Sequence, residues 1–289
     1  MMSPIRRLDE DLVNVVHTIA PEKSESLKEI DKLKINFLND KGFSFRVNTQ
    51  ENEMKLPTVA LEYVWCSCYT FYIMYQEYTN AKKSNLDATQ FNIKGNDRRR
   101  EALDLYQWGQ KRLQQEVPEP LRNKNITPEL KNNEDIDVAN ELYLASMAWI
   151  LHHELAHIRL KHPNSPINHE EEKQQEIEAD NSATKWILEG ICDEDMIQKR
   201  GLGIAIATLI LTSQDILAGE FKEKTHPKSF QRLYDALKAY FKDEDHLVYA
   251  FSSTILYLNM ALNGIEINHN DKETWKQNLE SCLIEFSHL

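Results

Sequence analysis

The stretch WILHHELAHIRLKH, residues 149–162, constrains the fold more than any other part of the sequence. Its apolar residues recur at helical spacing, so we expect a helix with a buried face. His153 and His157 are four residues apart, which places both imidazoles on one face, one turn apart. This arrangement suits two ligands of a tetrahedral metal ion such as Zn²⁺. Glu154 lies about 100° around the helix from His153. From there its carboxylate can hold a water molecule beside the metal and accept its proton.

A catalytic zinc site needs a third protein ligand, and the segment EIEAD, residues 176–180, offers three carboxylates. Glu176 and Asp180 share one face of a predicted helix, whereas Glu178 points about 200° away from Glu176. One of the first two could bind the metal while the other accepts a hydrogen bond from a ligating histidine. The alternative is a solvated acidic helix face, because residues 170–180 are strongly acidic.

The interval between the two motifs predicts how they meet. Residues 158–175 separate His157 from Glu176 and include Pro163 and Pro166. That length suits a helix end, a loop and a returning helix. An antiparallel helix pair would bring the motifs face to face, and this combination is more specific than the histidine pair alone.

The neighbouring histidines have less specific interpretations. His152 points about 100° away from His153, which favours a core position or support of a ligand. His162 ends the helix, where a positive charge suits the helix dipole. His169 lies in the following loop and could approach the site.

The composition indicates a helix-rich globular protein and argues against several partners. The 289 residues have a formal net charge of −12, with only 8 Gly and 9 Pro. Such an acidic chain has no general attraction to phosphate backbones, so no nucleic acid partner is expected. The longest apolar run, 201–211, is too short to cross a bilayer and suits a core helix. With four cysteines and no recognisable signal peptide, we expect reduced thiols and a cytoplasmic location.

The pattern along the chain predicts a mainly α-helical fold with a small β element. Helical spacing covers 5–38, broken at Pro21, and a strand at 42–48 is expected to form a hairpin with the segment before Pro57. The other predicted helices cover 58–80, 98–116, 138–162, 171–189, 196–219, 228–242 and 246–262.

A loop rich in Pro, Asn and Asp at 118–137 suggests how the chain is organised. We expect a mostly helical N-terminal region over 1–130, with a strand or hairpin near 42–57. A helical, zincin-like catalytic core would follow over 131–289. Both would belong to one compact unit.

The order of the motifs resembles the gluzincin metallopeptidases, in which HExxH is followed by ExxAD. The nearest pattern is that of the membrane CAAX-type and stress-protease branch, where the Glu four residues before the Asp is the third zinc ligand. This resemblance implies that Glu176 binds zinc, that Glu178 does not, and that Asp180 orients His153.

A downstream segment extends the same resemblance. THPKSFQRL at 225–233 is similar to the HPxxxxR sequence of that branch, whose His faces the scissile carbonyl and whose Arg lies nearby. The resemblance implies that His226 and Arg232 stabilise the oxyanion.

One departure points to a narrower family. The CAAX-type branch spans membranes, whereas here we expect no transmembrane segment, and an aromatic-rich helix, LEYVWCSCYTFYIMYQEY, precedes the metal motif. The chain resembles the Lit-type phage-exclusion peptidases, specifically over about 140–235. That resemblance implies a bacterial abortive-infection protein that cleaves a host translation factor after a phage peptide signals infection.

Together these observations predict a soluble zinc endopeptidase with a protein or peptide substrate. One zinc per chain would be held by His153, His157 and Glu176, with Glu154 as the general base. An activating peptide or an inhibitory partner would restrain it.

Two other classes remain open: a zincin-like regulatory protein or sensor with little turnover, and a helical interaction protein with a structural zinc. Glu154 favours the enzyme, because a structural site does not need that carboxylate and usually has four protein ligands.

Overall fold

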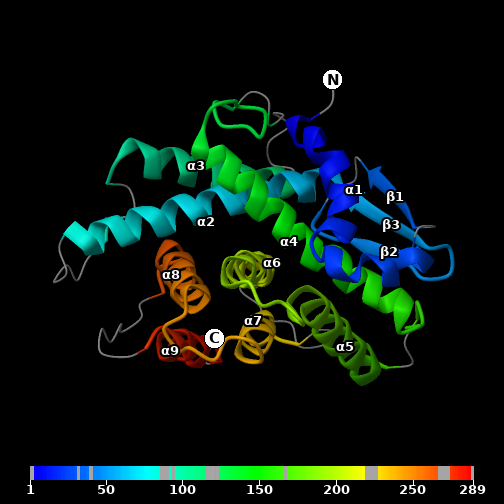
Figure 1. Cartoon of the computed structure of the whole chain (residues 1–289). Coiled ribbons are helices and arrows are strands. Elements are labelled where there is room, and N and C mark those ends of the chain that lie inside the picture. The colour runs from blue at the N-terminus through cyan, green and yellow to red at the C-terminus, as the bar shows by residue number, and fades with distance from the viewer. Residues whose placement is uncertain are drawn as a thin grey trace.

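The computed structural model describes residues 3–30, 33–38, 42–84, 91–92, 95–114, 121, 124–165, 168–218, 227–265 and 274–287. Its architecture is mainly α-helical with one small sheet, as the sequence predicts (Figure 1). Helix α4 (Glu134–Arg159) runs through the middle of the molecule and contacts α1, α2, α5, α6 and β2. The helix with the histidine motif is therefore the central one.

The helices predicted between residues 58 and 262 are all present, with ends that differ by a few residues. In the described part of the chain the helices, besides α4, are η1 (Pro4–Leu8), α1 (Asp9–Thr18), η2 (Pro21–Ile30), α2 (Thr58–Ser84), α3 (Asp97–Leu113), α5 (His169–Leu188), α6 (Glu194–Ala218), α7 (Ser229–Lys238), α8 (Leu247–Leu262) and α9 (Trp275–Ser287).

The sheet has three strands in the order β1-β3-β2. The predicted hairpin is confirmed: β2 (Arg46–Asn48) pairs antiparallel with β3 (Glu53–Pro57). On the other side of β3, β1 (Lys34–Leu38) pairs in parallel. β2 is therefore an edge strand, and it contacts α4.

The strand β1 corrects the prediction of helical structure over 5–38. Leu33, Ile35 and Phe37 are partly buried against the core and alternate along the chain with more polar residues. A period of two is that of a strand, and it outweighs the helical spacing of the residues before it.

One helix of the C-terminal region was not among the elements predicted individually, although it lies within the helical core expected over 131–289. Helix α9 packs against α7 and α8. Its core side chains recur at helical spacing and are buried: Leu279, Cys282, Leu283 and Phe286.

Helices α4 and α6 approach each other very closely. A Cβ on Gly203 of α6 would lie 2.7 Å from the backbone carbonyl carbon of Ala145 on α4, so only glycine permits this contact. Helix α6 contains the apolar run 201–211, and by length and composition it could cross a membrane. However, 72% of its most apolar window is buried inside the molecule, as in a core helix.

Helices α2 and α4 are neighbours although they lie on opposite sides of the predicted boundary near residue 130. The indole Nε1 of Trp65 donates to Asn140 Oδ1 at 2.8 Å, and buried residues of both helices belong to one hydrophobic cluster. The division of the chain into two regions stays a prediction.

Candidate metal centre and active site

Both helices that carry the candidate ligands begin at an asparagine cap. Asn133 Oδ1 accepts hydrogen bonds from the backbone amides of Asp135 and Ile136 at the start of α4. Asn168 Oδ1 accepts one from the amide of Glu171 at the start of α5. Side-chain caps of this kind define where a helix begins. They therefore help to fix which residues of α4 and α5 face each other.

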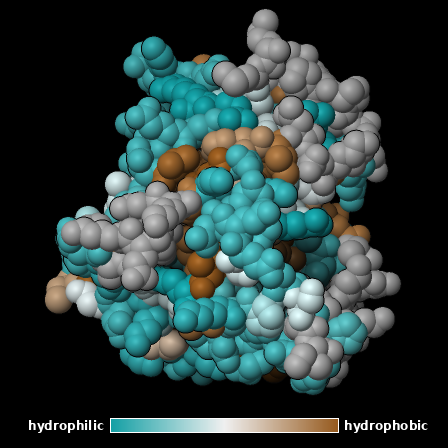
Figure 2. All heavy atoms as spheres, turned by 90° about the vertical axis from the view of Figure 1, so that its right-hand side faces the viewer, coloured by the Kyte–Doolittle hydropathy of each residue, from teal (hydrophilic) through white to brown (hydrophobic). Residues whose placement is uncertain are grey.

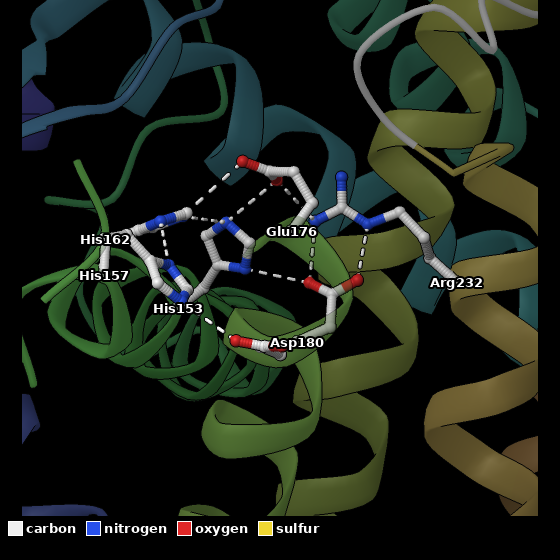
Figure 3. A network of polar contacts seen from close by, with 7 residues as sticks. His153, His157, His162, Glu176, Asp180 and Arg232 are labelled. Carbon is white, nitrogen blue, oxygen red and sulfur yellow. Dashed lines mark hydrogen bonds and ion pairs between the residues drawn. The ribbon is translucent and has the colours of Figure 1, made fainter. Parts of the chain in front are cut away.

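The C-terminal half of α4 and the first half of α5 bring the three predicted ligands together (Figure 3). His153 Nε2 lies 3.3 Å from His157 Nε2 and 3.3 Å from Glu176 Oε2, and His157 Nε2 lies 3.5 Å from Glu176 Oε1. Ligands about 2.1 Å from a tetrahedral zinc ion are separated from one another by about 3.4 Å. These three residues therefore have the spacing to hold such an ion.

Asp180 and Arg232 support His153 from the side away from His162 (Figure 3). The His153 Nδ1–H donates to Asp180 Oδ1 at 2.8 Å, which leaves Nε2 facing the other ligands. Arg232 donates to both oxygens of Asp180, at 2.7 Å each. Burial alone would raise the pKa of Asp180, but the charge of Arg232 and the hydrogen bond from His153 hold it below its ordinary value.

The two candidate histidine ligands differ in charge. Burial alone would lower the pKa of His153, but its hydrogen bonds and charge interactions with Asp180 and Glu176 raise it to about 10. Burial and the nearby charge of His153 lower the pKa of His157 to about 4. In the metal-free protein one proton on His153 therefore balances the surrounding carboxylates, a role that a cation could take over.

Glu154 lines the same cleft as the three ligands. Burial is the main cause that raises its pKa to about 7, and the charge of Glu176 raises it further. The charges of His153 and Arg232 and a hydrogen bond from the Val47 backbone act in the opposite direction. A carboxyl group with a pKa near neutrality is suited to accept and return a proton.

His162 also contacts the histidine cluster, a position that was not predicted from the sequence. Its Nδ1 lies 2.9 Å from His157 Nδ1, and its Nε2 lies 3.2 Å from Glu178 Oε2. Glu178 thus contacts His162 rather than the candidate ligands, as its place on the helix predicts. The sequence feature that could have indicated this contact is the position of His162 just after the helix end, where the chain can turn back toward the last helical turn.

The other residues named from the sequence lie in different surroundings. His152 is buried: its Nε2 contacts Val16 O at 3.0 Å, and burial lowers its pKa to about 3, so it is a core residue. His169 is exposed and pairs with Glu172 at 3.7 Å, outside the cluster. Arg232 lines the cleft, but its guanidinium binds Asp180, and its predicted role at an oxyanion stays a prediction. His226 lies outside the described residues.

A cleft of about 700 Å³ gives access to this cluster. The segment 43–49, which includes β2, lines one side together with Lys55 of β3. Residues of α4, α5 and α6, the loop 162–164 and Arg232 of α7 complete the lining. Figure 2 shows the face that carries the sheet and the ends of α4 and α5. It is hydrophilic over most of its area, with hydrophobic residues gathered near its centre.

Comparison with known proteins identifies the family. The Peptidase U49 family matches residues 54–252, which include the histidine motif and the carboxylates of α5. The chain is also 34% identical to the cell death peptidase of Escherichia coli (strain K12), over 100% of this chain and 99% of that protein. No solved structure matches. The family match and the full-length similarity to a peptidase together show that this chain belongs to the Peptidase U49 family.

Proposed function

We propose that this peptidase is a zinc-dependent endopeptidase, with one ion per chain held by His153, His157 and Glu176. The observation that carries the proposal is that the Nε2 atoms of the two histidines lie 3.3 Å apart and that each lies 3.3–3.5 Å from an oxygen of the Glu176 carboxylate. These separations are close to those between the ligands of a tetrahedral zinc ion. Three protein ligands leave one position open, as catalytic zinc sites require.

Zinc in this site would polarise the substrate carbonyl and lower the pKa of a water molecule. Glu154 then accepts a proton from that water as its oxygen bonds to the carbonyl carbon. The same carboxyl group returns the proton to the amide nitrogen as the C–N bond breaks, which releases an amine and a carboxylic acid. In the metal-free protein its pKa is about 7, so the carboxylate form, which accepts the proton, is already populated at neutral pH.

The edge strand β2 offers a way to bind an extended substrate. β2 lies at the end of the sheet order and lines the cleft beside Glu154. An extended peptide laid along such an edge gains main-chain hydrogen bonds. We infer that the substrate crosses the cleft beside β2, with its scissile bond next to Glu154.

The biological role that we propose is that of a bacterial anti-phage effector acting in the cytoplasm on a host translation factor. Its support is the name of the E. coli relative, a cell death peptidase, and the resemblance of the motifs to phage-exclusion peptidases. All four cysteines are free thiols, which agrees with a reducing compartment. An activating peptide or an inhibitory partner would keep the enzyme latent in healthy cells.

The test is expression of the wild type and of Glu154→Gln in a bacterial host, followed by mass spectrometry for newly cut proteins. Under this proposal both forms contain about one zinc per chain, and only the wild type is toxic and cuts host proteins. Glu170→Gln, an exposed change at the start of α5, serves as the matched control and should behave as the wild type. Cleavage that survives in Glu154→Gln contradicts the mechanism. Absence of cleavage by the wild type, with zinc still bound, favours the rival view of a regulatory protein with little turnover.

A further inference from the structure

His162 is held over the end of α4 by a specific backbone motif. Helix α4 ends at Arg159 with Leu160 as its C-cap residue, and Lys161 then adopts a left-handed conformation with φ 58°. The amide of His162 donates to His157 O at 2.9 Å, and the amide of Lys161 donates to Ile158 O at 3.1 Å. These two bonds define a Schellman motif, in which the residue after the left-handed one returns to the last turn of the helix. The motif places His162 directly against His157.

The two imidazoles contact each other edge to face. Their ring centroids are 4.9 Å apart, with an interplanar angle of 72°, and the two Nδ1 atoms are 2.9 Å apart. In such a contact one nitrogen must carry the hydrogen and the other must accept it. His162 is buried, with 7% of its surface exposed, so water does not readily replace this contact.

The hydrogen of each ring follows from the position of His157. When His157 Nε2 faces the metal, its Nδ1 carries the hydrogen and donates to His162 Nδ1. The remaining hydrogen of His162 then lies on Nε2, which donates to Glu178 Oε2 at 3.2 Å. Both imidazoles stay neutral, and the chain of hydrogen bonds ends on a carboxylate.

The other ligating histidine has a matching but shorter arrangement. His153 donates directly to Asp180, which Arg232 holds in place. Within the described part of the chain, His157 Nδ1 reaches a carboxylate only through His162. His162 and Glu178 together thus have the same position relative to His157 that Asp180 has relative to His153.

We propose that His162 is a positioning residue for the metal ligand His157, that it fixes the tautomer and orientation of that ring, and that Glu178 orients His162 in turn. This inference rests on the proposed zinc site. Groups that hold a ligating histidine from behind typically raise metal affinity 10- to 100-fold, which sets the expected size of the effect.

The test measures zinc binding, not activity. Zinc dissociation constants of the full chain are determined by competition with a chromophoric chelator, and dissociation rates by chelator trapping. His162→Leu keeps an apolar contact with the helix but cannot accept a hydrogen bond, and we expect its zinc affinity to fall about 10- to 100-fold. His162→Asn places an amide oxygen near the position of Nδ1, and it should restore most of the affinity. Glu178→Ala should have an intermediate effect, because its side chain is 47% exposed.

His169→Leu is the matched control, since this exposed histidine of α5 lies outside the cluster and its loss should leave zinc affinity unchanged. Urea unfolding of the metal-free forms separates positioning from packing: a merely structural His162 would change the unfolding midpoint and leave zinc affinity unaltered. The proposal is overturned if His162→Leu binds zinc within twofold of the wild type, or if His162→Asn is as weak as His162→Leu. If His162→Leu does not fold, the Asn and Glu178→Ala variants decide. A wild type without His153-dependent zinc binding would instead refute the proposed function itself.

Discussion

Replacing Glu154 with Gln should make the metal-free protein more stable at alkaline pH while it abolishes catalysis. The structure places this carboxyl group in a site that disfavours its charge, and its pKa rises from 4.5 to about 7. The folded protein therefore binds this proton more tightly than the unfolded chain does. The resulting penalty is absent below pH 4.5, grows as pH rises through 7, and is constant above that.

The magnitude follows from the size of the shift. At about 1.4 kcal/mol for each pKa unit, the rise gives an upper limit of about 3 kcal/mol above pH 8. Glu154 is partly exposed to the cleft, so solvent screens its charge and we expect about 1–2 kcal/mol. Gln keeps the size of the side chain and an oxygen that can accept the bond from the Val47 backbone, so little else should change.

The assay is urea unfolding of the chelator-treated protein at pH 5 and pH 8, with Glu170→Gln as the matched control. We expect Glu154→Gln to exceed the wild type in free energy of unfolding at pH 8, and to differ little at pH 5. The control should stay within a few tenths of a kcal/mol at both. The reasoning is refuted if the variant is no more stable at pH 8, or if its advantage is the same at both pH values. Cleavage of the proteins identified in cells should fall about 10²- to 10⁴-fold in the same variant.

Three further predictions concern the supporting residues and the metal. Arg232→Met removes the cation that binds both oxygens of the buried Asp180 and leaves only His153 beside it among the described residues, so it should cost the metal-free protein about 3 kcal/mol in urea unfolding. A loss below about 1 kcal/mol would show that His153 alone is enough to balance this carboxylate. His153 has a pKa of about 10 and must lose a proton when zinc binds, so zinc affinity should rise about tenfold per pH unit between pH 6 and 8. Calorimetry in two buffers should detect the release of about one proton per zinc bound. If no proton is released, His153 does not carry the charge assigned to it. Gly203→Ala forces α6 away from α4 and should destabilise the protein by about 1–3 kcal/mol, whereas an unchanged unfolding midpoint would mean that the helices separate at no cost.

Patterns local in sequence predicted much of this molecule. The i, i+4 spacing of His153 and His157 follows from helix geometry alone, and so does the opposite direction of Glu176 and Glu178. The segment between the two motifs is short, and this length predicts an antiparallel helix pair. Helices α4 and α5 do pack side by side.

The features that could not be predicted from the sequence depend on backbone conformation and on contacts between residues far apart along the chain. The place of His162 is set by the left-handed backbone of Lys161, a conformation that a lysine does not predict. Strand β1 forms because β3 lies beside it, a pairing between segments separated along the chain. The contact of Arg232 with Asp180 joins α7 to α5, and helical spacing within either segment says nothing about it.

Zinc content of the purified wild type, Glu176→Gln and Glu178→Gln, measured by mass spectrometry of the metal at micromolar protein, tests the central claim most directly. Glu176 lies 3.3–3.5 Å from both candidate histidine ligands, whereas Glu178 contacts only His162 among the cluster. We therefore predict about one zinc per chain in the wild type and in Glu178→Gln, and a marked loss in Glu176→Gln. Retention of zinc in Glu176→Gln together with its loss in Glu178→Gln would contradict the ligand set and move the third ligand by two residues.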